Sequence, residues 1–92
     1  MLSILDGLTI DYDAPEPPSR QIAARIRAAI EAGELQPGRK IPSETDIVQA
    51  TGVARTTARR AVALLRTETL VVTVAGRGSY VAGQLNAAGA PA

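Results

Sequence analysis

The chain has 92 residues, enough for one domain, and contains neither cysteine nor histidine. These absences exclude disulfide bonds, thiolate nucleophiles, imidazole bases and the usual zinc sites, so we expect no enzyme active site, no metal site and no cofactor. The formal net charge of +1 hides an asymmetry, because residues 1–18 hold four acids and no base whereas residues 19–92 hold all ten Lys and Arg.

Residues 1–18 are predicted to form an acidic arm in front of the folded domain. Residues 8–12 alternate apolar and polar side chains, which indicates a short half-buried or edge strand. The prolines among residues 13–18 exclude a helix and indicate an extended lead-in. Apolar side chains of the arm are candidates for pairing two chains: Leu2, Ile4, Leu5, Leu8 and Ile10. The first five residues are too short for a membrane span and lack the basic flank of a signal peptide.

A first helix is predicted to begin after Ser19, a candidate N-cap, and to end before Gly33. Apolar residues recur along it at helical spacing, which indicates one buried face. They are Ile22, Ala23, Ile26, Ala29 and Ile30. Residues 34–38 contain Pro-Gly and are typical of a turn, and a short extended piece, Arg39–Ile41, follows.

The next two predicted helices form a helix-turn-helix. Ser43, followed at the third position by Asp46, resembles a capping box, so a short helix should run from about Glu44 to Ala50. Gly52 breaks it, and a third helix should run from about Arg55 to Thr67. One side of this third helix gathers Ala58, Ala61, Val62 and Leu65, and a different side gathers Arg55, Arg59 and Arg66.

A β-hairpin is predicted to end the fold, with strands at residues 70–74 and 79–81 around the turn Ala75–Gly78. Residues 83–92 have almost nothing to bury and are expected to be disordered. The order of elements predicts an α+β, mainly α domain over residues 19–82. This domain is a winged helix-turn-helix, with three helices plus a C-terminal β-hairpin wing.

Two arginines at the start of the third helix are the candidates for reading DNA bases. A major groove about 12 Å wide admits one helix, whose first turns reach the base edges. Arg55 and Arg59 lie four residues apart, and a guanidinium matches O6 and N7 of guanine with two hydrogen bonds. Thr56 and Thr57 open the same helix, where hydroxyls and free amides bind phosphate. Alternatively, both threonines are ordinary helix-start residues.

Two further basic features are candidates for DNA contact. Arg77 lies between Gly76 and Gly78 at the hairpin tip, and a narrow A·T-rich minor groove attracts arginine. Glycines that only supply a positive φ are the alternative reading of this turn. Arg39 and Lys40 form a basic pair before the second helix, suited either to phosphate contact or to a solvated loop.

Short motifs occur in a recognisable order and spacing over about residues 15–83. They include Gln21-Ile22-Ala23, Gly33-Glu34-Leu35, Pro37-Gly38, Lys40-Ile41-Pro42-Ser43-Glu44, Gly52-Val53, Arg55-Thr56-Thr57, Arg59 and Gly76-Arg77-Gly78-Ser79-Tyr80-Val81. In these residues the chain resembles the N-terminal domain of GntR-family bacterial transcription regulators. The resemblance implies a cytoplasmic, nucleoid-associated regulator, usually a repressor, that binds palindromic operator sites in double-stranded DNA as a homodimer.

The resemblance also implies site residues. By position, the expected DNA contacts are Arg55, Thr56, Thr57, Arg59, Gly76 and Arg77, and possible further contacts are Ser43, Thr45, Lys40 and Gly78. A winged helix used only for protein contacts is the alternative function, because the fold alone does not fix function.

Four positions depart from the family pattern. Thr45 stands where the family commonly has a DNA-contacting arginine, and Ala54 stands where a serine or threonine often precedes the recognition helix. Thr69 replaces a frequent glycine, and Ser19 replaces a frequent tyrosine. Family members usually continue into a longer effector-binding domain, whereas a short Ala/Gly-rich stretch follows the wing here. The chain is therefore either a stand-alone minimal regulator or a truncated piece of a longer one, and in the first case we expect no small-molecule effector.

Overall fold

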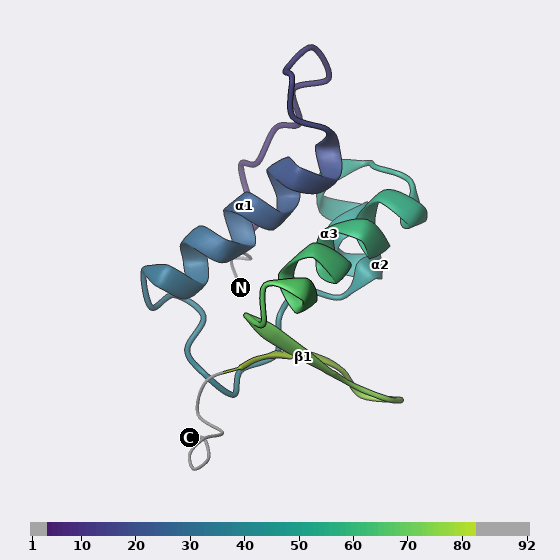
Figure 1. Ribbon diagram of the computed structural model, residues 1–92. Helices are drawn as coiled ribbons and strands as arrows, with labels where there is room; N and C mark the ends of the chain where they lie inside the picture. Colours follow the sequence, from purple (N-terminus) through teal and green to yellow (C-terminus); the bar gives the residue numbers. More distant parts are fainter. Residues whose placement is uncertain (1–3, 83–92) are drawn as a thin grey trace.

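Three helices and a two-stranded hairpin make up residues 4–82, the part of the chain that the computed structural model describes (Figure 1). In chain order they are α1 (Pro18–Glu31), α2 (Glu44–Thr51), α3 (Arg55–Thr67), β1 (Val71–Val74) and β2 (Gly78–Val81). This is the predicted, mainly helical winged helix-turn-helix. The tail predicted to be disordered, residues 83–92, lies outside the described residues.

Helix α1 begins one residue before the predicted cap position. Its N-cap is Pro17, which makes no side-chain capping bond, and Pro18 takes the first helical position. The fixed φ of proline suits that position, and its missing N–H would have no helical partner there. Ser19 therefore lies inside the first turn, and its prediction as N-cap is wrong. The predicted apolar face is confirmed for Ile22, Ala23, Ile26 and Ala29, which are buried, while Ile30 is half-buried.

Helix α2 begins with the predicted capping box. Ser43 Oγ accepts a hydrogen bond from the Asp46 amide at 3.0 Å, and the Ser43 amide donates to Asp46 Oδ2 at 3.0 Å. The helix ends at Thr51, one residue later than predicted, and the Thr51 hydroxyl donates to the Ile47 carbonyl at 2.7 Å. Gly52 then closes α2 with a φ of 78°, and α3 has its predicted bounds.

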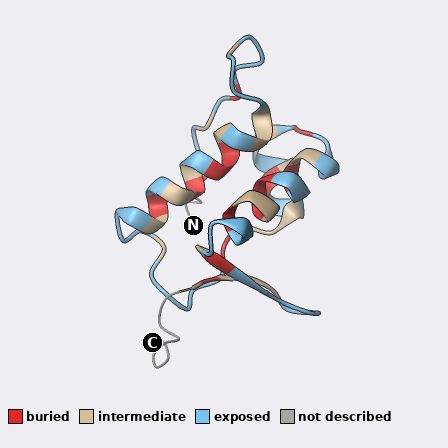
Figure 2. Cartoon of the chain, viewed as in Figure 1, coloured by how far each residue is buried: buried red, intermediate tan, exposed pale blue. Residues whose placement is uncertain are grey.

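The core lies between α1 and α3, whose buried faces meet (Figure 2). Helix α3 contributes the four predicted side chains, Ala58, Ala61, Val62 and Leu65. Helix α2 adds Ile47, and the ends of the wing add Val71 and Val81. Across residues 4–82, no helix has the length and apolar character needed to cross a bilayer. No three His, Cys, Asp or Glu side chains of this range gather as they would around a metal ion.

An ion pair also joins α1 to the residue that follows α3. Arg27 Nε and Nη2 donate to the two carboxylate oxygens of Glu68 at 2.8 and 2.7 Å. The hydrogen bond lowers the pKa of the Glu68 carboxyl and raises the pKa of the Arg27 guanidinium. Because both side chains remain partly exposed, the pair is a modest clasp between two helices that are already packed together.

The described part of the acidic arm, residues 4–17, is called the leader below. It packs onto the core, which corrects two predictions. Leu5 is 1% exposed and Ile10 is 9% exposed, so their interpretation as a surface for pairing two chains is wrong; Leu2 lies outside the described residues. Residues 8–12 do not form the predicted strand. The Asp11 amide instead donates to Gln21 Oε1 at 2.9 Å, and the Asp11 carbonyl accepts from Gln21 Nε2 at 2.8 Å. A side-chain amide of α1 thus takes the place of a neighbouring strand.

The wing is an antiparallel hairpin that reaches out beside α3 (Figure 1). Val71 lies opposite Val81 at its base, and Val74 lies opposite Gly78 at its outer end. The turn consists of residues 75–77, so Gly78, which was predicted in the turn, is the first residue of β2.

Residues 39–41 run along β2 as an edge segment of the wing. The Ile41 amide donates to the Ser79 carbonyl at 2.9 Å, and Lys40 forms an isolated antiparallel bridge with Tyr80. The predicted extended piece is therefore confirmed, and its partner is the wing. Since neighbouring side chains of an extended segment point to opposite faces, this pairing separates the two adjacent basic residues of the segment.

Candidate nucleic-acid interface

The start of α3 is exposed and has no side-chain cap. Ala54, the N-cap, has an extended backbone and makes no capping bond, as the sequence predicts. The first amides of a helix have no partner within the helix, and together with the helix dipole they favour an anion. Thr56 is exposed beside these amides, whereas Thr57 is half-buried. The phosphate contacts expected of both threonines stay a prediction.

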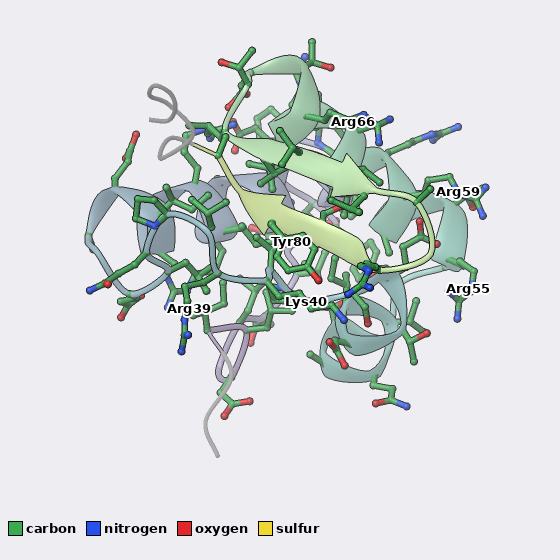
Figure 3. The ribbon with its side chains drawn as sticks, turned by 90° about the horizontal axis from the view of Figure 1, so that it is seen from below. Arg39, Lys40, Arg55, Arg59, Arg66 and Tyr80 are labelled. Atoms are coloured by element: carbon green, nitrogen blue, oxygen red, sulfur yellow. The ribbon has the colours of Figure 1, made fainter. Side chains whose placement is uncertain are left out.

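Arg55 and Arg59 project from the first turns of α3 along one side of the molecule (Figure 3). Their side chains are 53% and 62% exposed. Arg55 Nη1 lies 3.5 Å from Glu44 Oε1, and Arg59 Nε lies 3.8 Å from Glu44 Oε2. The structure thus brings the two candidate base-reading residues together, and one carboxylate at the start of α2 faces both.

Glu44 is the residue of this surface that sequence reasoning missed. An acid in the first turn of a helix complements the helix dipole, so Glu44 could pass for an ordinary helix-start residue. The signal that could have found it is the helix-turn-helix itself. The turn at Gly52 folds α2 against α3, and the first residue of α2 then meets the first turns of α3.

Thr45 is tied to the same cluster. Its Oγ1 accepts a hydrogen bond from Arg55 Nη2 at 3.1 Å. The shorter side chain that replaces the family's arginine therefore supports a neighbouring arginine. A direct contact between Thr45 and DNA stays a prediction.

A shallow cavity of about 280 Å³ joins α2, α3 and the wing. Its lining includes the four residues predicted as possible DNA contacts together with Arg55: Lys40, Ser43, Thr45 and Gly78. The Lys40 side chain crosses Gly78, where a Cβ atom would lie 2.8 Å from Lys40 Cε. Gly78 also has a φ of 118°, so glycine at this position provides both the backbone angle and the space for the lysine.

Arg39 does not share this surface. It lines a second cavity of about 470 Å³, together with Glu34, Tyr80 and also Lys40. Figure 3 shows Arg39 and Arg55 on opposite sides of the view, with the wing between them. Of the basic pair of the sequence, only Lys40 also lines the cavity that contains Arg55 of α3.

Gly76 and Arg77 lie at the wing tip and do not line the cavity. Gly76 has a φ of 76°, and the Arg77 amide donates to the Val74 carbonyl at 2.9 Å, which closes the turn. The Arg77 side chain is exposed. Its entry into a minor groove stays a prediction, as does close approach of Gly76 to DNA.

Arg66 connects the end of α3 to the inner face of the wing. Arg66 Nη1 donates to Thr73 Oγ1 at 3.2 Å, and the Thr73 and Ser79 hydroxyls lie 2.9 Å apart. This polar chain sets the wing relative to α3 beyond the apolar contacts at its base. Sequence reasoning grouped Arg66 with the cationic face but did not identify this role.

This fold and surface have counterparts among known proteins. Residues 18–81 match the model of the family described as bacterial regulatory proteins, gntR family. The chain is 41% identical over 66 residues to the mannosyl-D-glycerate transport/metabolism system repressor MngR of Escherichia coli (strain K12), covering 72% of this chain and 28% of that protein. It is 35% identical over 74 residues to the HTH-type transcriptional repressor NagR of Bacillus subtilis (strain 168), covering 80% of this chain and 30% of that protein.

Solved structures give the same result. AraR(DBD) in complex with operator ORX1 superposes with a TM-score of 0.73 at 32% identity, covering 80% of this chain and 94% of that one. YtrA from Sulfolobus acidocaldarius, a GntR-family transcription factor, superposes with a TM-score of 0.75 at 34% identity, covering 88% and 82%. The chain thus spans less than a third of the two repressors but most of these structures. Through its winged helix-turn-helix, it belongs to the gntR family of bacterial regulatory proteins.

Proposed function

We propose that this domain binds operator DNA with sequence specificity and acts as a transcriptional repressor. The observation that carries the proposal is the exposed pair Arg55 and Arg59, one turn apart at the uncapped start of α3. The operator complex of AraR(DBD) has the same fold, and the relatives MngR and NagR are named repressors, which supports it. A cytoplasmic location, on the nucleoid when bound, goes with this function.

In the proposed complex, α3 lies in the major groove. Arg59 turns its Nε toward Glu44, which leaves Nη1 and Nη2 as a fork for O6 and N7 of a guanine. Arg55 reads a neighbouring base from one turn earlier. Thr56, Thr57 and the first amides of α3 bind phosphate oxygens and fix the register of the helix.

The wing and the cavity beside it contact the DNA backbone and the minor groove. Arg77 enters the minor groove, where the small Gly76 permits close approach of the backbone. Lys40 and Ser43, with Gly78 beneath the lysine, face a phosphate between the two grooves. These contacts position the domain, whereas the arginines of α3 select the sequence.

We infer that two copies bind a palindromic operator. One recognition helix covers one half-site, and half-sites about 10 base pairs apart lie on the same face of the duplex. Because Leu5 and Ile10 are buried inside each chain, pairing of copies does not use them.

Selection of bound sequences from random duplex DNA tests this function, followed by affinity measurements on the selected site. Arg55→Ala and Arg59→Ala should each weaken binding by about 1–3 kcal/mol and relax the preference at one base pair per half-site. Arg25→Ala is the matched control. It removes the same charge from α1, where Arg25 pairs with Glu34, and should leave the base preference unchanged.

The same measurements identify the alternative function. A DNA-binding domain loses affinity steeply between about 50 and 200 mM salt, because bound phosphates release counterions. A wild-type chain that selects no sequence and binds DNA weakly at low salt would contradict the proposal and favour a winged helix used for protein contacts.

A further inference from the structure

The carboxylate of Glu44 occupies an unusual place for an acid, in the middle of the surface that should meet a polyanion. It faces Arg55 Nη1 at 3.5 Å and Arg59 Nε at 3.8 Å, and its side chain is 34% exposed. Glu44 opens α2 rather than α3, so it is held by a different element from the two arginines it contacts. The contacts therefore depend on the tertiary arrangement of the helix-turn-helix.

The geometry of each guanidinium determines which hydrogen-bond donors stay available. Arg59 faces Glu44 with its Nε edge at 3.8 Å, an ion-pair distance that is too long for a hydrogen bond, so both Nη groups remain at the outer end of the side chain. Arg55 Nη2 donates a hydrogen bond to the Thr45 hydroxyl, and Nη1 lies at ion-pair distance from Glu44, so the guanidinium is oriented from two sides. An arginine fixed in this way loses less conformational freedom when it binds a base edge.

Glu44 also affects the two ways of binding DNA differently. In non-specific binding, arginines turn toward phosphates, which supply most of the affinity. A carboxylate between two arginines repels those phosphates and competes for the same N–H groups. In specific binding, the arginines reach neutral base edges at their outer ends, and their contacts with Glu44 can persist.

We propose that Glu44 is a positioning residue that raises sequence selectivity by suppressing phosphate contacts of Arg55 and Arg59 while orienting both for base edges. The inference rests on the proposed function, since it concerns the same surface. It adds a specificity-determining residue that is not expected to form the main base contacts itself.

The test compares wild type, Glu44→Gln and Glu31→Gln on two duplexes: the site selected by the wild-type chain and a scrambled sequence of equal length. Glu31 is an exposed acid at the far end of α1, so its substitution changes the charge equally. Glu44→Gln should bind the scrambled duplex more tightly, and its ratio of specific to non-specific affinity should fall about tenfold, because one carboxylate faces two arginines. Glu31→Gln should keep the wild-type ratio.

The salt dependence of non-specific binding separates this role from a merely structural one. Arginines released from Glu44 can neutralise more phosphates, so the slope of log affinity against log salt should steepen by about one unit in Glu44→Gln. Glu44→Ala should change both readouts in the same direction, and thermal unfolding checks that each variant is folded.

An unchanged ratio in folded Glu44→Gln, whether both affinities rise together or neither does, would overturn the inference. Glu44→Gln could instead lose specific affinity while the salt slope of its non-specific binding stays at the wild-type value. Glu44 would then only support the structure, and this result would also contradict the inference. A wild-type ratio near one would instead contradict the proposed function, which makes the two failures distinguishable.

Discussion

Thr69 shows how one residue can hold a conformation against its own preference. It follows α3 with a φ of 62°, and among residues 4–82 it is the non-glycine residue with a positive φ. A β-branched residue is strained in this region because its Cβ crowds the backbone. The chain reverses here to start β1, so the fold needs the angle whatever residue occupies the position. The resemblance to the GntR family predicted glycine at this position.

Replacing Thr69 with glycine should therefore stabilise the protein. The free energy of unfolding is expected to rise by about 1 kcal/mol, because glycine adopts a positive φ without steric cost. Urea unfolding measures it. Thr67→Gly is the matched control: Thr67 lies in the last turn of α3, where glycine should lower stability by about 0.5–1 kcal/mol. Equal effects at both positions would contradict the strain at Thr69.

At the scale of elements, the helices and the wing could be predicted because their signals are local. The Ser43 and Asp46 capping box, the break at Gly52 and the spacing of the buried side chains of α3 each depend on a few neighbouring residues. The start of α1 was missed because Ser19 is by itself the better N-cap residue, whereas Pro18 fits the first helical position and keeps the residue before it, Pro17, extended.

The contacts between elements could not be predicted from the sequence. The sequence places Arg39 and Lys40 side by side, and only the pairing of residues 39–41 with β2 shows that Lys40, and not Arg39, also lines the cavity beside Arg55. Glu44 meets Arg55 through the angle between α2 and α3, which follows from the helix-turn-helix as a whole and not from the residues next to Glu44. The candidate arginines were found because the start of a recognition helix is a local feature; the residue that organises them is not.

The ion pair between Arg27 and Glu68, called the clasp above, should make the stability of the fold depend on pH in the acidic range. The pKa of Glu68 is lowered by its hydrogen bonds from Arg27, so the clasp contributes stability above the ordinary glutamate pKa of about 4.3 and loses it as the pH falls through the lower folded value. Thermal unfolding of wild type and Glu68→Gln between about pH 3 and 7 measures this, and the gap should close toward low pH. A gap that stays constant with pH would show that Glu68 acts otherwise.

For the whole molecule, the leader is part of the folded unit. Leu5 enters the same core as α1 and α3, and Gln21 holds the Asp11 backbone and the Glu16 carbonyl. The sequence could not reveal this, because an apolar residue in a short segment can pack within its own chain or against another chain. Packing against distant residues decides between the two.

Leu5→Ala tests the leader's place in the core. Deleting a buried leucine side chain costs about 2–5 kcal/mol, and the loss should appear in urea unfolding independently of protein concentration. Leu8→Ala, at a half-buried position of the same segment, should cost less. A loss for Leu5→Ala that varies with concentration would indicate that the leader joins two chains.

The hydrogen bonds from Gln21 to the leader also determine where the leader's charges lie. Gln21 binds the carbonyls of Asp11 and Glu16, and the segment that contains them lies at one end of the molecule while the wing extends at the other (Figure 1). A loose acidic segment could swing toward Arg55 and Arg59 and neutralise them, whereas the fastened segment keeps Glu16 beside Arg20 and Arg27 of α1. In the proposed complex, the leader's carboxylates therefore do not compete with DNA phosphates for the arginines of α3.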